Sequence, residues 1–204
     1  MANWITVGRF PVLLAIIMLL YAADPGARLA AVVLMFILIG MDTLDGVVAR
    51  ARKEVSLLGS VLDIMADRAV ELTLWIVYAD LGLAPVAIPI IYVLRGTIVD
   101  SLRSMAVSAG QAPFKSMRTE LGKWLVGSPF MRSSYGVSKL ISFAGLAAVN
   151  ALSAYAARGA VAISTVRWLS LLFLFTSWVS VMFCLARGLP VIIEALPALD
   201  KPRT

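Results

Sequence analysis

The sequence contains no histidine, a single cysteine and few charged residues for its length. Without histidine, imidazole is excluded as a metal ligand, a proton carrier or the activator of a nucleophile. The lone Cys184 excludes a disulfide within the chain and a zinc site built from cysteines. Any chemistry must therefore use carboxylates, cations and backbone groups.

Polar residues are scarce as well. Of the 204 residues, 61% are hydrophobic and 15% are charged, whereas soluble domains average roughly 45–50% and about 25%. A helix needs about 20 residues to cross a hydrocarbon layer of about 30 Å. The composition predicts an all-α integral membrane protein, a single domain over residues 1–204 with six transmembrane helices. The expected spans are 4–22, 29–49, 60–78, 85–105, 138–157 and 166–185.

Two stretches of this pattern need a further interpretation. The first apolar run follows Arg9 and resembles a signal peptide, but its small-residue cleavage pattern is poor. The long connection over residues 106–137 contains cations with Gly and Pro breaks, which predicts a short amphipathic helix at the membrane interface.

The charges are distributed unevenly between the two sides of the predicted bundle. The 18 Lys and Arg exceed the 12 Asp and Glu, for a net charge of +6. Twelve cations fall in the loops after the second and fourth spans or in the C-terminal tail, against three on the other side. Because cytoplasmic loops carry the excess of cations, we expect both termini on the cytoplasmic side of the cell (inner) membrane. The predicted partner of this basic face is the lipid bilayer, not nucleic acid.

Five acidic residues lie in runs that are otherwise apolar enough to span. They are Asp42, Asp45, Asp63, Asp67 and Glu71. At the centre of a membrane helix each costs roughly 2.5–3.5 kcal/mol. Residues three or four positions apart share a helix face, so the second and third spans each present a carboxylate pair. If these spans are antiparallel, four carboxylates converge at their cytoplasmic ends and need cations to neutralise them.

Oxygen ligands without His or Cys favour Mg²⁺ or Mn²⁺, and such ions keep coordination positions for substrate phosphates. We therefore expect one of these ions and a substrate that carries phosphate. Gly46, Ala49 and Gly59 flank the carboxylates. They allow either close helix packing or the approach of a flat group such as a nucleotide base.

The acidic segment reads Asp42-x-x-Asp45-Gly46-x-x-Ala49-Arg50, then eight residues to Gly59, three to Asp63 and three to Asp67. This spacing resembles the signature of the CDP-alcohol phosphotransferase family of integral membrane enzymes. The chain matches that signature at all eight specified positions. The resemblance extends to the six-helix layout, with the polar site at the cytoplasmic ends of helices 2 and 3.

The resemblance implies transfer of a phosphatidyl group from a CDP-linked lipid, CDP-diacylglycerol, to the hydroxyl of a polar acceptor, with release of CMP. It also implies that four aspartates bind two divalent ions, or one ion plus the catalytic proton site, and that the last of them is the general base. The implied metal ligands are Asp42, Asp45, Asp63 and Asp67, and the implied base is Asp67. The implied cytidine pocket is lined by Gly46, Ala49 and Gly59, with Arg50 near the nucleotide phosphates.

Looser matches point to family members that make phosphatidylglycerol phosphate. Asn3, Thr6 and Arg9 resemble their Asn-x-x-Thr-x-x-Arg start, so Asn3 and Thr6 are expected at the CDP site. Arg95 and Arg103 are similar to an Arg-x7-Arg stretch of the same members and lie two turns apart on one helix face. The expected acceptor-phosphate residues are Arg95, Arg103, Arg118, Arg132 and Lys139.

The acceptor itself stays open. The phosphatidylglycerol-phosphate enzymes show a Gly-Lys-x-Lys-Thr element where this chain has Gly136-Val-Ser138-Lys139-Leu. The leading acceptor is sn-glycerol 3-phosphate, and inositol phosphate, serine or another alcohol are alternatives.

Two other classes compete with an enzyme. Intramembrane acids also occur in small cation transporters and channels, which would show inverted repeats or broken helices. A scaffold with buried salt bridges has too few cations for five acids. We also expect a homodimer, through small residues such as Gly145, Ala147 and Ala148.

Overall fold

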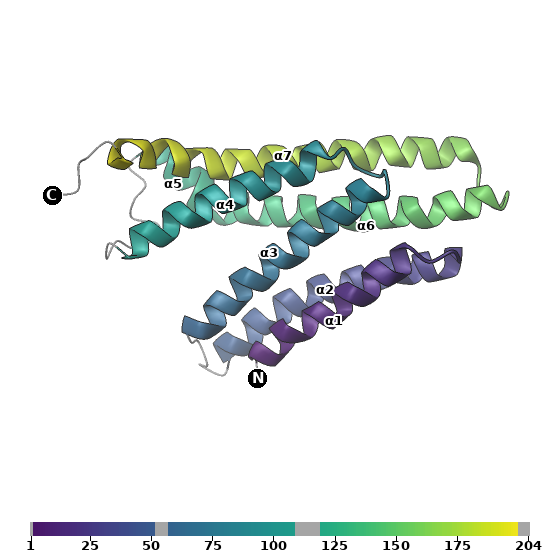
Figure 1. The fold of residues 1–204 in the computed structure, drawn as a ribbon, viewed down its shortest axis with the longest axis horizontal. Coiled ribbons are helices and arrows are strands. Elements are labelled where there is room, and N and C mark those ends of the chain that lie inside the picture. Colours follow the sequence, from purple (N-terminus) through teal and green to yellow (C-terminus); the bar gives the residue numbers. More distant parts are fainter. Residues whose placement is uncertain (1, 52–56, 109–118, 200–204) are drawn as a thin grey trace. The chain divides into compact units, whose positions relative to one another are not determined.

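The computed structural model of the chain describes residues 2–51, 57–108 and 119–199, and all regular structure in these ranges is α-helical. Side chains are described there except at 2–5, 42–51, 57–58, 60, 103, 105–108 and 196–199. The helices are α1 (Ala2–Leu20), α2 (Pro25–Ala51), α3 (Leu57–Asp80), α4 (Ala87–Ser108), α5 (Glu120–Gly127), α6 (Pro129–Ala157) and α7 (Ile163–Leu199) (Figure 1). A helix coincides with every predicted span, and α5 lies in the long connection, where a short helix was expected.

Two helices begin with the same capping pattern. The Asp24 carboxylate accepts a hydrogen bond from the backbone N–H of Ala27 at 3.0 Å, at the start of α2. The Ser128 hydroxyl accepts one from the backbone N–H of Met131 at 3.1 Å, at the start of α6. A proline follows each capping residue, where the missing N–H costs nothing. This pattern explains why α6 starts at Pro129, nine residues before the predicted span at 138.

Glycines end two helices. Gly82 after α3 and Gly159 in the α6–α7 turn have φ angles of 70° and 74°. This left-handed region suits glycine because a Cβ atom would be strained there. It lets the next backbone N–H groups return to the helix, from Leu83 to Tyr78 O and from Ala160 to Tyr155 O.

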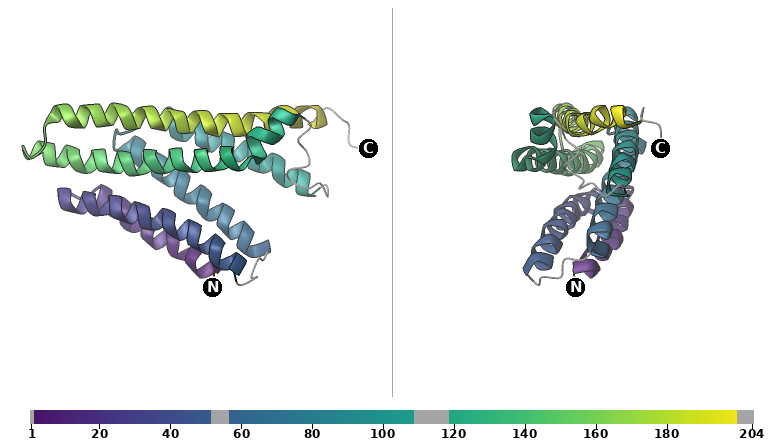
Figure 2. Two further views of the ribbon diagram at one scale, coloured as in Figure 1. Left: turned by 180° about the vertical axis from the view of Figure 1, so that it is seen from behind. Right: turned by 90° about the vertical axis from the view of Figure 1, so that its left-hand side faces the viewer.

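The chain divides into two compact units. Unit 1 contains Met1–Val86 and Leu140–Phe175, and unit 2 contains Ala87–Lys139 and Thr176–Thr204. In unit 1, α1 packs against both α2 and α3 (Figure 2). Its core includes Trp75, whose ring centroid lies 4.8 Å from that of Phe143, and Tyr78, whose hydroxyl donates to Phe143 O at 2.6 Å. Trp75 and Tyr78 are fully buried, so they anchor α3 against α6.

The C-terminal end of α1 is closed by two polar side chains. Asn150 of α6 is buried and donates from Nδ2 to Leu20 O at 2.8 Å. Arg28 of α2 donates from Nε to Ala22 O at 2.7 Å and from Nη1 to Asn150 Oδ1 at 3.2 Å. The last carbonyls of a helix have no partner within it, so these bonds satisfy groups that would otherwise be orphaned.

The small residues of α6 are used within this unit. A Cβ atom at Gly145 would lie 2.0 Å from Cδ1 of Phe173, so glycine lets α7 approach α6 closely. Ala147 is fully buried. The expectation that these two residues form a dimer surface is therefore wrong, because they already pack inside the protomer.

Unit 2 is built around α4, α5 and the adjoining parts of α6 and α7. Its core contains Val99, Val126 and Val191. The hydroxyls of Tyr92 and Ser180 are hydrogen-bonded at 2.8 Å. Thr119 caps α5 by accepting from Gly122 N, and its own hydroxyl donates to Glu194 of α7 at 2.6 Å.

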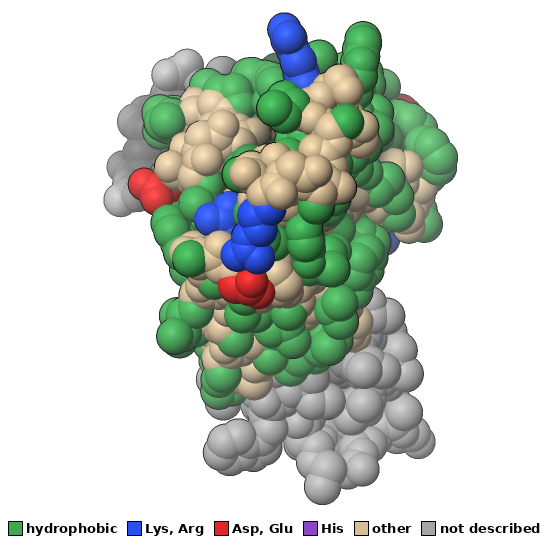
Figure 3. Space-filling model, turned by 90° about the vertical axis from the view of Figure 1, so that its right-hand side faces the viewer, with side chains coloured by type: hydrophobic (Ala, Val, Ile, Leu, Met, Phe, Trp, Pro, Cys, Tyr) green, Lys and Arg blue, Asp and Glu red, His purple; other side chains and the backbone are tan. Residues whose placement is uncertain are grey.

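Within the described ranges, two helices are long and apolar enough to cross a membrane by length and composition, over Pro129–Ala157 and Ile163–Ala195. Many large hydrophobic side chains are exposed, among them Met18, Ile163 and Trp168. The face drawn in Figure 3 is accordingly mostly hydrophobic, with few charged side chains. These features and the composition support a membrane protein, and the count of six crossings stays a prediction.

Candidate active site

The acidic residues of α3 divide into two groups. Asp63 and Asp67 lie one turn apart, and their side chains are 50% and 51% exposed. Glu71 continues the same spacing but is only 4% exposed, and it accepts a hydrogen bond from Arg68 at 2.8 Å. The buried acid is thus neutralised within α3, whereas the two aspartates form an accessible carboxylate pair.

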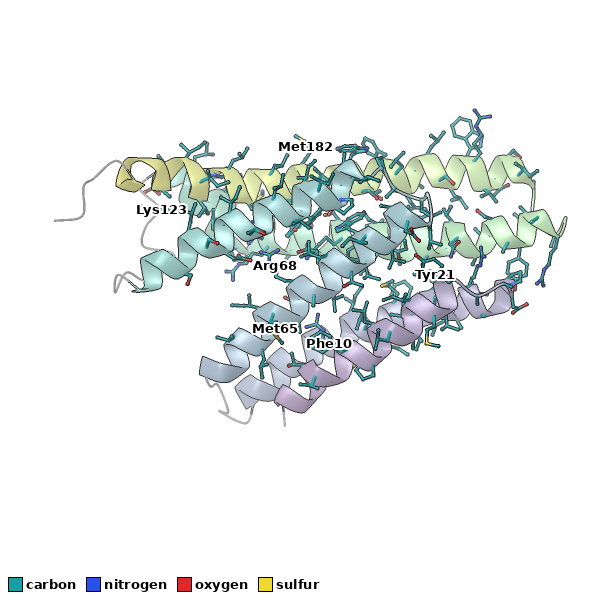
Figure 4. All side chains as sticks on the ribbon, viewed as in Figure 1. Phe10, Tyr21, Met65, Arg68, Lys123 and Met182 are labelled. Atoms are coloured by element: carbon teal, nitrogen blue, oxygen red, sulfur yellow. The ribbon has the colours of Figure 1, made fainter. Side chains whose placement is uncertain are left out.

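Arg9 of α1 contacts this pair. Its Nη2 atom donates to Asp67 Oδ1 at 2.8 Å, and its Nη1 atom lies 3.8 Å from Asp63 Oδ1. The arginine is buried, with 4% of its side chain exposed. Figure 4 labels the neighbours in sequence of these residues, Phe10 on α1 and Met65 on α3, where the two helices meet. A buried guanidinium therefore lies against the open carboxylates from the α1 side.

The same part of α1 also meets α2. A Cβ atom at Gly8 would lie 3.4 Å from Cε of Met41, the residue before Asp42. Consecutive residues of α1 thus contact α2 just before its acidic motif and α3 at its acidic motif. Thr6, one turn before Arg9, is buried. The first helix is therefore the element that bridges the two halves of the motif.

Several predicted site residues lie outside what the structure describes. The backbone of α2 includes Asp42, Asp45, Gly46, Ala49 and Arg50, but their side chains are not among those described. The same holds for Asn3 in α1 and Arg103 in α4, and Arg118 lies outside the described ranges altogether. Gly59 belongs to α3 and is half-buried. For these residues the predicted roles remain predictions.

The donor chemistry of the pair suits a hard divalent cation. Asp63 and Asp67 supply only oxygen atoms, from one helix face and with side chains accessible to solvent. Such ligands match Mg²⁺ or Mn²⁺. Among the described residues, no group of three or more acids, cysteines or histidines that could hold a metal ion is assembled.

Unit 2 contains further cations, and one of them, Arg95 of α4, is buried. This arginine is 7% exposed, and within the described part of the chain it has neither an ion-pair partner nor a hydrogen-bond partner for its Nε atom. A Cβ atom at Gly188 of α7 would lie 2.7 Å from Arg95 Nε and 2.8 Å from its Cγ. The glycine therefore leaves the space in which the arginine side chain lies.

Other cations surround a tyrosine of the same unit. Lys139 Nζ lies 4.5 Å from the centroid of the Tyr135 ring, and Arg187 Cζ lies 5.6 Å from it. Arg187 also donates to Val126 O at 3.3 Å. Arg132 is exposed and donates to Gly127 O at 3.1 Å. The structure thus brings Lys139 together with Arg187, a residue that follows the sixth predicted span.

Comparison with known proteins agrees with the motif. A family model described as CDP-alcohol phosphatidyltransferase matches residues 1–187. None of the curated proteins matches the chain. The matched region covers α1 to α6 and extends into α7. It therefore includes Arg9 with its α3 carboxylates, and Arg95.

Proposed function

We propose a specific reaction for this chain, which belongs to the CDP-alcohol phosphatidyltransferase family and is a phosphotransferase of that class. In our proposal it transfers the phosphatidyl group of CDP-diacylglycerol to the hydroxyl of a polar acceptor and releases CMP. The observation that carries the proposal is the accessible pair Asp63 and Asp67, held by Arg9 inside the family's motif. Family membership also favours an enzyme over a small cation transporter or channel.

The family uses divalent metal ions generally. We propose that Asp42, Asp45, Asp63 and Asp67 hold Mg²⁺ or Mn²⁺, in two copies. When bound, the ions neutralise charge on the diphosphate and on the departing CMP. The close approach of Gly8 to Met41 supports this ligand set. It places the start of the α2 motif next to α1, the helix whose Arg9 also binds Asp67 of α3.

Asp67 is the proposed general base. Its Oδ1 atom accepts the hydrogen bond from Arg9, which leaves Oδ2 to take the proton of the acceptor hydroxyl. The acceptor oxygen then forms a bond to the phosphorus of the phosphatidyl group as the bond from phosphorus to the CMP oxygen breaks. The electrons of that bond leave with CMP, and the proton stays on Asp67.

The nucleotide part of the donor is assigned by the motif alone. We propose that Gly46, Ala49 and Gly59 leave room for the cytidine and that Arg50 lies near its phosphates. Asn3 and Thr6 are proposed to close this site from α1. The burial of Thr6 one turn from Arg9 supports an inward position for this part of the helix.

The proposed acceptor is sn-glycerol 3-phosphate. Arg95 supports a phosphorylated acceptor, because a buried guanidinium without an anionic partner in the described residues suits a phosphate that enters from outside. The other proposed phosphate residues are Arg103, Arg118, Arg132 and Lys139. Inositol phosphate, serine or another alcohol in the same reaction are the alternatives.

We further propose that both termini and the active site face the cytoplasm at the inner membrane, and that the protein is a homodimer. The orientation is supported by the excess of cations in the predicted cytoplasmic loops. The dimer is carried over from the sequence prediction, without the two buried residues of α6.

The test is CMP release by purified protein in detergent with CDP-diacylglycerol. Glycerol 3-phosphate, inositol 1-phosphate, serine and inositol are supplied in parallel, each with Mg²⁺, with Mn²⁺ and with EDTA. We expect CMP only with glycerol 3-phosphate and a divalent ion. Release with a different single acceptor would change the acceptor, and release in EDTA would contradict the metal sites.

A further inference from the structure

Arg9 is an unusual residue for its place in the chain. Helix α1 has 19 residues, and Arg9 is the only charged one in its sequence. The side chain is 4% exposed. Burying a guanidinium costs free energy unless anions and hydrogen bonds compensate it. The partners of Arg9 on α3 therefore explain how this helix tolerates it.

The guanidinium makes one hydrogen bond and one longer ion pair to α3. Nη2 lies 2.8 Å from Asp67 Oδ1, and Nη1 lies 3.8 Å from Asp63 Oδ1. The guanidinium thus extends across two carboxylates one helix turn apart. A planar guanidinium presents its N–H groups in a fixed fork and stays charged at any physiological pH, whereas a lysine supplies only a single point charge.

We infer that Arg9 is the positioning residue of the α3 carboxylates and their permanent counterion. It holds Asp67 by Oδ1, which keeps Oδ2 turned toward the reacting hydroxyl. Its charge also offsets part of the negative charge that would attract cations to the pair. The first role rests on the proposed function of Asp67, whereas the second depends only on the ion pairs of the structure.

The two roles are separated by two substitutions in the full chain, Arg9→Met and Arg9→Lys. Arg9→Met removes the charge, and Arg9→Lys retains it without the fork. Mn²⁺ binding is measured without substrate, from the electron paramagnetic resonance signal of free Mn²⁺. We expect Arg9→Met to bind Mn²⁺ about tenfold more tightly at low salt, because a repulsive charge next to the site is gone. Arg9→Lys should bind Mn²⁺ as the unmodified protein does.

Turnover should respond differently. Both variants should lower kcat for CMP release about a hundredfold, since neither side chain can contact Asp67 and Asp63 at once as the guanidinium does, while KM for CDP-diacylglycerol changes less than threefold. A merely structural arginine would instead weaken Mn²⁺ binding along with activity, and Arg9→Lys would restore both.

Arg28→Met is the matched control. It removes the same charge from a partly buried arginine of unit 1, whose partners are Ala22 O and Asn150. Those partners lie at the C-terminal end of α1, 11 residues from Arg9 to Leu20 and therefore roughly 16 Å along the helix. We expect a less stable protein with unchanged Mn²⁺ affinity and unchanged kcat.

The outcomes keep this inference distinct from the proposed function. Mn²⁺ affinity and kcat that stay at the unmodified values in Arg9→Met would overturn the inference and leave the proposed function standing. Tighter Mn²⁺ binding in Arg9→Met, together with no CMP release by the unmodified protein with any acceptor, would support the counterion role and overturn the proposed function. If Arg9→Met does not fold, Arg9→Lys decides, because normal turnover in that variant contradicts the positioning role.

Discussion

Arg9 and Arg95 are both buried arginines, but the two units of the molecule meet their charges in different ways. Arg9 has two carboxylates of α3 as partners. Arg95 lies over Gly188 and has no carboxylate partner in the part of the chain that the structure describes. Unit 1 thus neutralises its arginine internally, whereas we propose that the charge of Arg95 in unit 2 is met by an anion from outside.

The largest effect is expected from Asp67→Asn, which replaces the carboxylate that pairs with Arg9 by a neutral amide. An amide cannot take the acceptor proton, so CMP release should fall by about 10²–10⁴-fold, the range of general-base catalysis. The measurement is the rate of CMP formation with saturating substrates.

Asp80→Asn is the control for this prediction, because Asp80 lies at the other end of α3 and bonds to Tyr21. Its turnover should match the unmodified protein. A similar, mild loss in both variants would contradict the role of Asp67.

The proposed role of Arg95 in unit 2 is tested by Arg95→Ala. A hydrogen bond to a charged group contributes about 1.5–3 kcal/mol, so KM for a phosphorylated acceptor should rise about tenfold to a hundredfold. KM for CDP-diacylglycerol should not change. Initial rates over a range of each substrate separate the two constants.

Lys123→Ala serves as the comparison for Arg95, since Lys123 is an exposed cation of unit 2 paired with Glu120. It should leave both KM values as they are. If Arg95→Ala raised only KM for the lipid, Arg95 would belong to the donor site.

A smaller effect is expected from Gly188→Ala. The added Cβ atom would lie 2.7 Å from Arg95 Nε, so the arginine must move while its charge remains. We expect KM for the phosphorylated acceptor to rise about threefold to tenfold, less than in Arg95→Ala.

Gly136→Ala is the matched substitution, because a Cβ atom there would meet nothing within 4 Å. It should raise stability slightly through helix propensity and leave KM unchanged. Equal KM values in the two alanine variants would show that the space over Gly188 does not matter for the acceptor.

The smallest effect on activity is expected from Asn150→Ala, which tests an arginine with neutral partners. The substitution deprives Leu20 O and Arg28 of a hydrogen-bond partner and should lower the free energy of unfolding by about 1–3 kcal/mol. The midpoint of thermal unfolding in detergent should fall by several degrees, with kcat unchanged. A loss of kcat at full stability would contradict a purely structural role.

Hydropathy predicted where the helices of this chain lie, because six apolar runs are separated by polar or Gly and Pro residues. It missed the ends of α6 and α7, which extend through segments containing Arg132 and Glu194. A hydropathy window detects apolar side chains, whereas a helix continues through polar residues as long as its backbone bonds are satisfied. The Ser128 cap was the local signal for the earlier start of α6.

The motif predicted which acids of α3 belong to the site, but not what holds them. Arg9 and Asp67 are 58 residues apart in sequence, and only the packing of α1 on α3 brings them together. The sequence also did not predict that Glu71 differs from the two aspartates. Its spacing matches that of Asp63 and Asp67, but its side chain is buried and forms an ion pair with Arg68. Gly188 shows no signal in the sequence for its contact with Arg95.

The cap at Asp24 and Pro25 has a consequence for the depth of the acidic motif. It sets the first residue of α2, and 17 residues of unbroken helix lead from Pro25 to Asp42. At 1.5 Å per residue, Asp42 lies about 26 Å along the axis from this start, a little less than the hydrocarbon thickness of about 30 Å. The start of α2 therefore sets the position of Asp42 along the helix axis. One residue inserted between the cap and the motif would shift Asp42 by about 1.5 Å along the helix axis and rotate its position by about 100° around that axis.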